Sequence, residues 1–455
     1  MKLTIIGTGY VGLVSGACFA EHGFDVTCVD KDRDKIQTLK EGKLPLFEPN
    51  LFDFINKNMR DGRLHFTTEL KDPILTSDII FIAVGTPCDS TTGRANLTDL
   101  FSLLKKMAPF LVGYKTIVMK STVPVGTTKQ VGEYIRTLNS KAKFDVVANP
   151  EFLREGSAIQ DFMQPDRIVV GTESTTAKKI MQCLYNPFAL AGVPVIETTL
   201  ETAELIKYAS NAFLATKIAF INQISDLCEK CNGDVRQVAK GIGLDHRIGK
   251  EFLNVGPGFG GSCFPKDMQA LIHTSNDVGV PLTIVDAALK SNQNRKDEMV
   301  NRIISAEGGC IQGKILAVLG LTFKANTDDL RESPSLAIIP ELCAAGATVR
   351  AYDPRGMPAT RKLLPDIFYA TDAYQAIEGA DALIILTEWE EFKTLDLRQV
   401  KNFLKSPLVI DLRNIFSSDE MKLHKFIYYS LGNCSFFPSK DEEIEDLPYE
   451  KDSFL

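Results

Sequence analysis

Leu3-Thr-Ile-Ile-Gly-Thr-Gly-Tyr-Val-Gly12 decides the fold of the N-terminal part of the chain. A short apolar strand runs into three spaced glycines, a helical pattern follows, and a second strand over residues 25–29 ends on Asp30. This order of strand, glycine turn, helix, strand and acid is typical of a dinucleotide-binding unit. The glycines would allow a tight turn, the approach of a pyrophosphate and close packing of the helix. Asp30 would accept hydrogen bonds from the adenosine ribose and repel a 2′-phosphate, so the sequence predicts NAD rather than NADP.

Polar loops follow further predicted strands at 78–84, 116–120 and 144–148. The carboxyl ends of the strands in an open parallel sheet line the ligand crevice, so we expect these loops to contact cofactor or substrate. Turn chemistry alone also explains Gly, Pro, Ser and Asn in loops. For the loop at 85–87 the two interpretations are about equally supported. For Thr122 and Glu151 we favour ligand contact over turn chemistry.

A cysteine stands before a predicted helix in Gly258-Phe-Gly-Gly-Ser-Cys-Phe-Pro-Lys-Asp267. Pro265 suits the first turn of a helix. The positive end of the helix dipole and the nearby Lys266 would both favour the thiolate of Cys263. Thiolates attack carbonyl carbons, so the segment indicates covalent catalysis. A structural cysteine is the commoner outcome for a lone Cys, but the flanking glycines, the Pro-Lys-Asp sequence and the N-terminal unit favour catalysis.

Apolar residues recur at helical spacing from about 201 to 231 without an interrupting Pro or Gly. A helix of about 45 Å exceeds the needs of a small domain, so we expect it to join two domains and to bury one face against another subunit. Glu204, Lys207 and Asn211 fall on one helix face. A solvated face is the default interpretation, although the apolar surroundings favour a buried polar pair for Lys207 and Asn211. Cys228-x-x-Cys231 is interpreted as ordinary helix sequence, because a zinc site needs further ligands.

A second strand–turn–helix–strand unit begins near residue 314 and ends on Asp353, without the three spaced glycines. Lys324, Arg331 and Arg413 follow predicted strand ends, where they could meet an anionic ligand. Exposed Lys and Arg are mostly solubilising, so each residue alone is a weak signal. The sequence therefore predicts an α/β protein with two Rossmann-like doubly wound domains joined by a long central helix. The expected parts are 1–200, 201–300 and 301–437, followed by an acidic, loosely ordered tail at 438–455.

Composition narrows the class of protein. The net charge of −7 argues against general nucleic-acid binding, and no apolar run reaches the length that spans a membrane. The first residues do not resemble a signal peptide, and the ten cysteines are scattered as in reduced cytosolic proteins, so we expect a cytoplasmic enzyme. No metal site is expected.

Several motifs together resemble the nucleotide-sugar 6-dehydrogenases over nearly the whole chain. The resemblance rests on 7–12, Leu44-Pro-Leu-Phe-Glu-Pro-Asn50, Lys120-Ser-Thr-Val-Pro-Val-Gly126, Asn149-Pro-Glu-Phe-Leu-Arg-Glu-Gly156, 258–267 and Phe323-Lys-Ala-Asn-Thr-Asp-Asp-Leu-Arg331. It implies oxidation of a sugar C6 alcohol to a carboxylate with two NAD, through a thioester on cysteine, in a homodimer or higher homo-oligomer. The motifs at 44–50 and 262–266 look most like the branch that acts on UDP-glucose. A sister enzyme for GDP-mannose or a UDP-N-acetylhexosamine, and a non-catalytic NAD-binding protein, are the alternatives.

The resemblance also implies roles for individual residues. The catalytic set is Cys263 as nucleophile, Lys207 and Asn211 at the oxyanion, Asp267 in proton transfer, and Thr122 and Glu151 in hydrolysis. The cofactor contacts are Gly7, Gly9, Tyr10, Val11, Gly12, Asp30, Lys35, Thr86, Ser121, Thr122, Glu155, Lys266 and Arg331. The nucleotide-sugar contacts are Glu151, Phe152, Leu153, Glu155, Lys207, Asn211, Arg247 (from the other subunit), Phe252, Asn254, Gly260, Cys263, Phe323, Lys324 and Arg413. Asn254 stands where animal members carry lysine, which leaves its role in diphosphate binding open.

Overall fold

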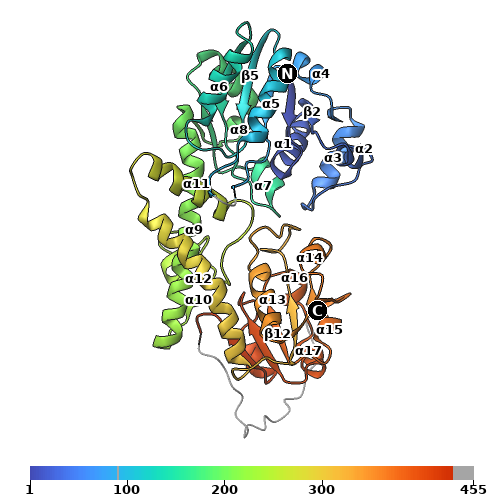
Figure 1. Ribbon diagram of the computed structural model, residues 1–455, viewed down its shortest axis with the longest axis vertical. Helices are drawn as coiled ribbons and strands as arrows, with labels where there is room; N and C mark the ends of the chain where they lie inside the picture. Colours follow the sequence, from blue (N-terminus) through green and yellow to red (C-terminus); the bar gives the residue numbers. More distant parts are fainter. Residues whose placement is uncertain (90–91, 434–455) are drawn as a thin grey trace, which may run out of the picture.

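Two α/β domains lie at opposite ends of a column of long helices in the computed structural model, which describes residues 1–89 and 92–433 (Figure 1). The N-terminal domain is at the top of the view and the C-terminal domain at the bottom, with α9 (Leu200–Cys231) and α12 (Thr283–Ala306) along one side. The acidic tail predicted at 438–455 lies outside the described residues.

The described part of the N-terminal domain contains an eight-stranded sheet in the order β3-β2-β1-β4-β5-β6-β7-β8. Its strands are β1 (Lys2–Ile6), β2 (Asp25–Val29), β3 (Leu64–Thr67), β4 (Ile79–Ile82), β5 (Tyr114–Met119), β6 (Lys143–Ala148), β7 (Ile168–Gly171) and β8 (Val195–Thr198). The strands from β3 to β6 pair in parallel, whereas β7 is antiparallel to β6. The order reverses between β1 and β4, and ligands bind at such a switch point in doubly wound sheets.

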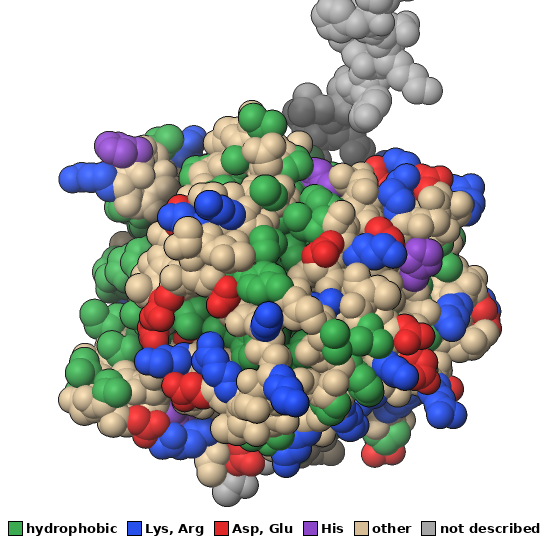
Figure 2. Space-filling model, turned by 90° about the horizontal axis from the view of Figure 1, so that it is seen from above, with side chains coloured by type: hydrophobic (Ala, Val, Ile, Leu, Met, Phe, Trp, Pro, Cys, Tyr) green, Lys and Arg blue, Asp and Glu red, His purple; other side chains and the backbone are tan. Residues whose placement is uncertain are grey.

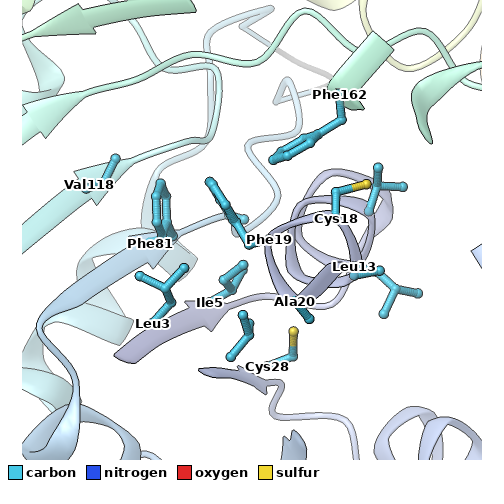
Figure 3. Close-up of a cluster of buried hydrophobic side chains, with 14 of the residues drawn as sticks. Leu3, Ile5, Leu13, Cys18, Phe19, Ala20, Cys28, Phe81, Val118 and Phe162 are labelled. Atoms are coloured by element: carbon cyan, nitrogen blue, oxygen red, sulfur yellow. The ribbon is translucent and has the colours of Figure 1, made fainter. Parts of the chain in front are cut away.

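Helices cover both faces of this sheet. They are α1 (Tyr10–Glu21), α2 (Arg33–Lys40), α3 (Leu51–Arg60), α4 (Lys71–Thr76), α5 (Thr98–Met107), the 3-10 turn η1 (Ala108–Phe110), α6 (Thr127–Leu138), α7 (Ala158–Met163) and α8 (Thr175–Leu190). Figure 3 shows Phe19 of α1 between Phe81 of β4 and Phe162 of α7, with ring centroids 5.2 and 5.0 Å from Phe19. This packing fixes α1, and therefore the glycine turn at its N-terminus, on the sheet.

The central region is helical. It consists of α9, α10 (Val235–Gly243), α11 (Phe264–Asp277) and α12. Thr199 caps the start of α9, and Asn232 ends it in the left-handed conformation (φ 56°). Because α9 packs against α11 and α12, side chains of α9 meet the segment that carries Cys263.

The C-terminal domain holds a second, fully parallel sheet in the order β11-β10-β9-β12-β13-β14 within the described chain. Its elements are β9 (Ile315–Leu319), α13 (Pro334–Ala344), β10 (Thr348–Tyr352), α14 (Met357–Leu363), β11 (Phe368–Tyr369), α15 (Ala373–Ile377), β12 (Ala382–Ile385), α16 (Glu390–Lys393), α17 (Leu397–Phe403), β13 (Leu408–Asp411), α18 (Ser418–Leu423) and β14 (Ile427–Ser430). The predicted fold class, two Rossmann-like domains joined by a long helix, is confirmed.

The surface at the end of the N-terminal domain mixes charges of both signs. Figure 2 shows Lys and Arg side chains interspersed with Asp and Glu on this face. Such mixing keeps the local field small. Among the described residues, every helix is too short or too polar to cross a bilayer.

Candidate active site

The glycine turn forms a cradle at the N-terminus of α1. Gly7 has a positive φ of 103°, and a methyl group on Gly12 would lie 1.9 Å from the Gly7 carbonyl oxygen. A methyl group on Gly9, by contrast, would meet no atom within 4 Å. The outer two glycines are therefore required by the fold itself, whereas Gly9 leaves open the space that a pyrophosphate would occupy. These residues fit a dinucleotide.

Asp30 lies beside this cradle at the end of β2. Its Oδ2 accepts hydrogen bonds from the backbone N–H and the hydroxyl of Thr8, both at 2.8 Å, and Lys35 Nζ is 3.5 Å away. Burial opposes ionisation, but the hydrogen bonds and Lys35 lower the pKa of Asp30. The carboxylate is thus held as a charged acceptor at the edge where a ribose hydroxyl is expected.

The strand-end aspartate of the second unit is different. Asp353 is fully buried, and Oδ2 accepts hydrogen bonds from Leu321, Thr322 and the indole of Trp389. Its Oδ1 accepts from the backbone of Arg355 and Gly356. Because the protein occupies both oxygens, this unit does not offer the acceptor that the first unit offers.

The predicted loop hydroxyls meet at the carboxyl ends of β4 and β5. Thr86 Oγ1 donates to the carbonyl oxygen of Thr122 at 2.7 Å, and Ser121 Oγ donates to that of Val84 at 2.6 Å. The two loops are therefore tied together beside the glycine cradle. Tyr10 extends the connection, because its hydroxyl accepts from the backbone N–H of Gly156 at 2.8 Å.

Four predicted catalytic side chains form two buried pairs between α9, α11 and the loop after β6. Lys207 Nζ lies 3.0 Å from Glu151 Oε1, and Asn211 Nδ2 donates to Asp267 Oδ2 at 2.6 Å. All four are less than a tenth exposed. The default interpretation of Lys207 and Asn211 as a solvated helix face was wrong, because α11 and the N-terminal domain cover this part of α9.

Cys263 is the residue before the first turn of α11, and its half-buried thiol lies 3.5 Å from Ser262 Oγ. The helix N-terminus and Lys266 were expected to favour the thiolate, but against that expectation loss of surrounding water raises the pKa of Cys263 to about 11. Lys207 opposes this shift, and the Glu151 and Asp267 carboxylates add to it. Lys266, which the sequence offered as the stabilising cation, is engaged by Asp267 Oδ1 at 2.6 Å. Lys207 therefore takes the place of Lys266 as the cation that favours the thiolate.

Glu155 joins the three parts of the chain. Its carboxylate accepts hydrogen bonds from Ser262 Oγ at 3.0 Å, Thr327 Oγ1 at 3.1 Å and Arg331 Nη2 at 3.4 Å. Burial and the charge of Asp329 raise the pKa of Glu155 to about 7, against the effect of Arg331. Two residues predicted as cofactor contacts, Glu155 and Arg331, thus meet where the domains face each other.

The loop before Cys263 packs against the C-terminal domain. A methyl group on Gly260 would lie 2.2 Å from the carbonyl oxygen of Glu332 and 3.2 Å from Phe323 Cβ. Arg413 donates to the carbonyl oxygen of Phe323 at 2.8 Å, and burial lowers the pKa of Lys324. Phe323, Lys324 and Arg413 are thus gathered beside this loop.

The remaining predicted contacts are placed less centrally. Phe152 lies under Arg167, whose guanidinium carbon is 3.7 Å from the ring centroid, and the Leu153 N–H donates to Glu151 Oε2 at 2.6 Å. Arg247 is exposed and paired with Asp245, and Asn254 is exposed. Among the described residues, no hydrogen bond or ion pair joins Arg247 or Asn254 to the buried pairs.

Polar residues to which the sequence analysis gave no role in the site also surround it. Lys120 is buried behind Glu151, and Glu204 accepts hydrogen bonds from Gly126 and Thr128 at the start of α6. Asn292 of α12 bonds both the N–H and the carbonyl oxygen of Phe259. The signal of Lys120 and Glu204 in the sequence is a polar residue at the end of an apolar strand or within an apolar helical pattern, whereas Asn292 lies in a polar helix and has no such signal.

Three family models match the chain in the order of its domains. They describe the NAD binding domain (residues 1–189), the central domain (201–294) and the UDP binding domain (317–418) of the UDP-glucose/GDP-mannose dehydrogenase family. The first match contains the glycine cradle and Asp30, so fold and site define an NAD-dependent oxidoreductase. The chain belongs to the UDP-glucose/GDP-mannose dehydrogenase family, which confirms the family and the cofactor predicted from the motifs.

Individual relatives match over nearly their whole length. A UDP-glucose 6-dehydrogenase of Rhizobium meliloti (strain 1021) is 52% identical over 434 residues, which cover 95% of this chain and 99% of that protein. UDP-glucose 6-dehydrogenase TuaD of Bacillus subtilis (strain 168) is 49% identical, with 99% and 97% covered. A solved UDP-glucose dehydrogenase from Pyrobaculum islandicum has a TM-score of 0.87 at 34% identity, with 94% and 96% covered.

Proposed function

We propose that the chain oxidises UDP-glucose to UDP-glucuronate in two successive steps at one site. The observation that carries the proposal is the half-buried thiol of Cys263 at the start of α11, one turn before Asp267, whose carboxylate accepts a hydrogen bond from Asn211 of α9 at 2.6 Å. Oxidation of an alcohol to an aldehyde needs no thiol, whereas a further oxidation to the acid gains from a covalent intermediate. Relatives that carry the name UDP-glucose 6-dehydrogenase support this substrate.

In the first oxidation, Lys207 and Asn211 stabilise the negative charge that develops on the C6 oxygen. Asp267, hydrogen-bonded to Asn211, takes part with Lys207 in removing the hydroxyl proton. NAD held by the glycine cradle and Asp30 would supply the hydride acceptor for each of the two oxidations.

The second oxidation begins when Cys263 loses its proton and its sulfur adds to the aldehyde carbon. The new C–S bond places an oxyanion beside Lys207 and Asn211, and loss of a hydride from C6 converts the thiohemiacetal into a thioester. Thr122 and Glu151 position and deprotonate a water that attacks the thioester carbon. The C–S bond then breaks, and the thiol recovers its proton as the acid leaves.

The remaining site residues bind the two ligands. The glycine cradle, Asp30, Lys35, Thr86, Ser121, Lys266 and Arg331 hold the cofactor, with Glu155 between cofactor and sugar. The nucleotide-sugar lies along 252–260 against Phe323, Lys324 and Arg413, with Phe152 and Leu153 beside the sugar.

Two chains pair through α9. Phe213, Phe220 and Leu227 recur every seven residues on this helix and are 66%, 50% and 57% exposed in the single chain. An apolar line at this spacing is suited to packing against a second helix. Pairing would bring the exposed Arg247 of one chain toward the sugar of the other. Replacing Phe213 and Phe220 together by Glu should convert the dimer to monomers in light scattering after gel filtration.

The function is tested by counting products. The purified chain is incubated with NAD and, separately, UDP-glucose, GDP-mannose and UDP-N-acetylhexosamines, and NADH formed per sugar consumed is measured. Two NADH and one UDP-glucuronate per UDP-glucose are expected, and Cys263→Ser should bind both ligands but stall before the acid. Consumption of another sugar in place of UDP-glucose would refute the substrate, and one NADH per sugar would refute the thioester steps.

The described cysteines are free, as in a reducing cytosol, and we place the enzyme in the cytoplasm.

A further inference from the structure

Lys120 is a buried cation with an unusual set of partners. It follows β5, is 6% exposed, and donates from Nζ to Asn149 Oδ1 at 3.1 Å. Asn149 is itself fixed by the hydroxyl of Tyr185 at 2.6 Å and by the carbonyl oxygen of Val169 at 2.7 Å. Among the described residues, no carboxylate lies within ion-pair distance of Lys120. Burying a charge without a counter-ion is costly, so Lys120 requires a compensating anionic group nearby.

Glu151 is the neighbouring carboxylate that the charge of Lys120 can compensate. A cavity of about 40 Å³ is lined by Lys120, Asn149, Glu151, Arg167 and Tyr185, together with apolar side chains. One water needs roughly 10–15 Å³ of such space, so about two or three waters fit between these groups. Burial lowers the pKa of Lys120 to about 8. The carboxylate of Glu151 opposes this shift and the charge of Lys207 adds to it, so the three side chains interact electrostatically. Glu151 therefore pairs with Lys207 at 3.0 Å and shares with Lys120 a cavity that has room for water.

The charges show why two cations are useful. Lys207 and Glu151 neutralise each other at 3.0 Å, and so do Lys266 and Asp267 at 2.6 Å. In the proposed function, on which this inference rests, Lys207 must turn from Glu151 toward the anion at C6. Without another cation, that movement would leave a buried carboxylate uncompensated.

We propose that Lys120 is a positioning residue: through the hydrated cavity it compensates Glu151, which frees Lys207 to stabilise the anion that forms at C6. Lys120 touches neither substrate nor cofactor in this arrangement. It acts through Glu151, the base in thioester hydrolysis. The other polar and charged groups that face Glu151 and Lys207 are Arg167 ahead of β7, Tyr185 on α8, and Cys263 and Asp267 at α11.

The test compares Lys120→Met with Lys120→Arg and the wild type by following NADH formation from pH 5 to 9. Removing a nearby cation raises the pKa of a carboxylate by roughly one unit or more. Lys120→Met should therefore move the acid limb of kcat up by about one pH unit. On that limb kcat should fall about tenfold, with the KM values for NAD and nucleotide-sugar unchanged, and Lys120→Arg should restore part of the loss. Glu155 titrates in the same range but is present in every variant, so the difference between variants reports Lys120.

Two further variants separate charge from packing. Tyr185→Phe removes a hydrogen bond from the same cavity without removing a charge, and should keep the acid limb of the wild type. Asn149→Asp keeps Lys120 in place but pairs it with a carboxylate, so it should shift the limb as Lys120→Met does, even if Lys120→Met fails to fold. An unchanged limb in Asn149→Asp, or an equal shift in Tyr185→Phe, would overturn the proposal.

The outcome is distinguishable from failure of the proposed function. If the wild type oxidises a different nucleotide-sugar, the same comparison is made with that sugar and tests Lys120 without UDP-glucose. If the wild type makes UDP-glucuronate and all variants share its pH profile, the function stands and the role of Lys120 is refuted.

Discussion

The reactivity of Cys263 should depend on Lys207 rather than on Lys266. The structure raises the pKa of this thiol to about 11 through burial, with Lys207 as the opposing cation. The reactive thiolate therefore becomes more abundant as the pH rises toward that value. At pH 8 the neutral thiol is the prevailing form.

Lys207→Met removes the cation and also removes the ion-pair partner of Glu151 at 3.0 Å, and both effects disfavour the thiolate. A charge at about 4–6 Å shifts a pKa by roughly 1–3 units, so alkylation of Cys263 at pH 8 should slow at least about tenfold. Iodoacetamide modification is followed by peptide mass mapping, because Cys183, Cys231 and Cys310 are exposed and react as well. Circular dichroism checks that the variant is folded.

The matched control deletes the competing explanation. Lys266→Met combined with Asp267→Asn removes the neutral 2.6 Å pair as a unit and should leave alkylation of Cys263 equally fast or faster. The reasoning is refuted if Lys207→Met alkylates at the wild-type rate, or if the double variant slows as much as Lys207→Met. Such a result would return the helix N-terminus and Lys266 to the role that the sequence suggested.

Three other variants probe the cradle, the loop and the domain junction. Gly9→Ala should fold normally but bind NAD at least about tenfold more weakly, as measured by calorimetry. The methyl group of Gly12→Ala would lie 1.9 Å from a carbonyl oxygen, so the free energy of unfolding of this variant should fall by about 1–3 kcal/mol or more, as measured by thermal unfolding. Gly260→Ala should raise KM for the nucleotide-sugar without weakening NAD binding, and Gly241→Ala, which meets nothing within 4 Å, is its silent control. The raised pKa of Glu155, about 7, makes its stabilising effect complete below about pH 4.5 and lost as pH rises through 7. The Tm of Glu155→Gln minus that of the wild type should therefore grow between pH 5 and 8, and a constant difference would contradict this.

Local pattern was enough for much of the fold. The strand predicted at 25–29 has those bounds in the structure, and the helix predicted over about 201–231 is Leu200–Cys231. Each is a short apolar run or a helical repeat bounded by turn residues, so its signal lies within its own segment. The helix α12 was not predicted, because its sequence is too polar to show a clear apolar stripe.

Motif spacing also named most side chains that the structure gathers around Cys263. The pairs Lys207–Glu151 and Asn211–Asp267 join positions 56 residues apart along the chain, and nothing local states which partner each will meet. The reversal of β7 against β6 has the same origin, since strand direction depends on how the chain returns to the sheet.

By itself, the sequence determined the two Rossmann-like units, the long helix between them and the presence of a thiol before a helix, because propensity and periodicity act over a few residues. Only the tertiary structure decided the burial that raises the pKa of that thiol, the cation that lies near it and the cavity that Lys120 shares with Glu151. Protonation depends on how much water the folded chain removes and on which charges remain nearby, and both are properties of packing between distant segments.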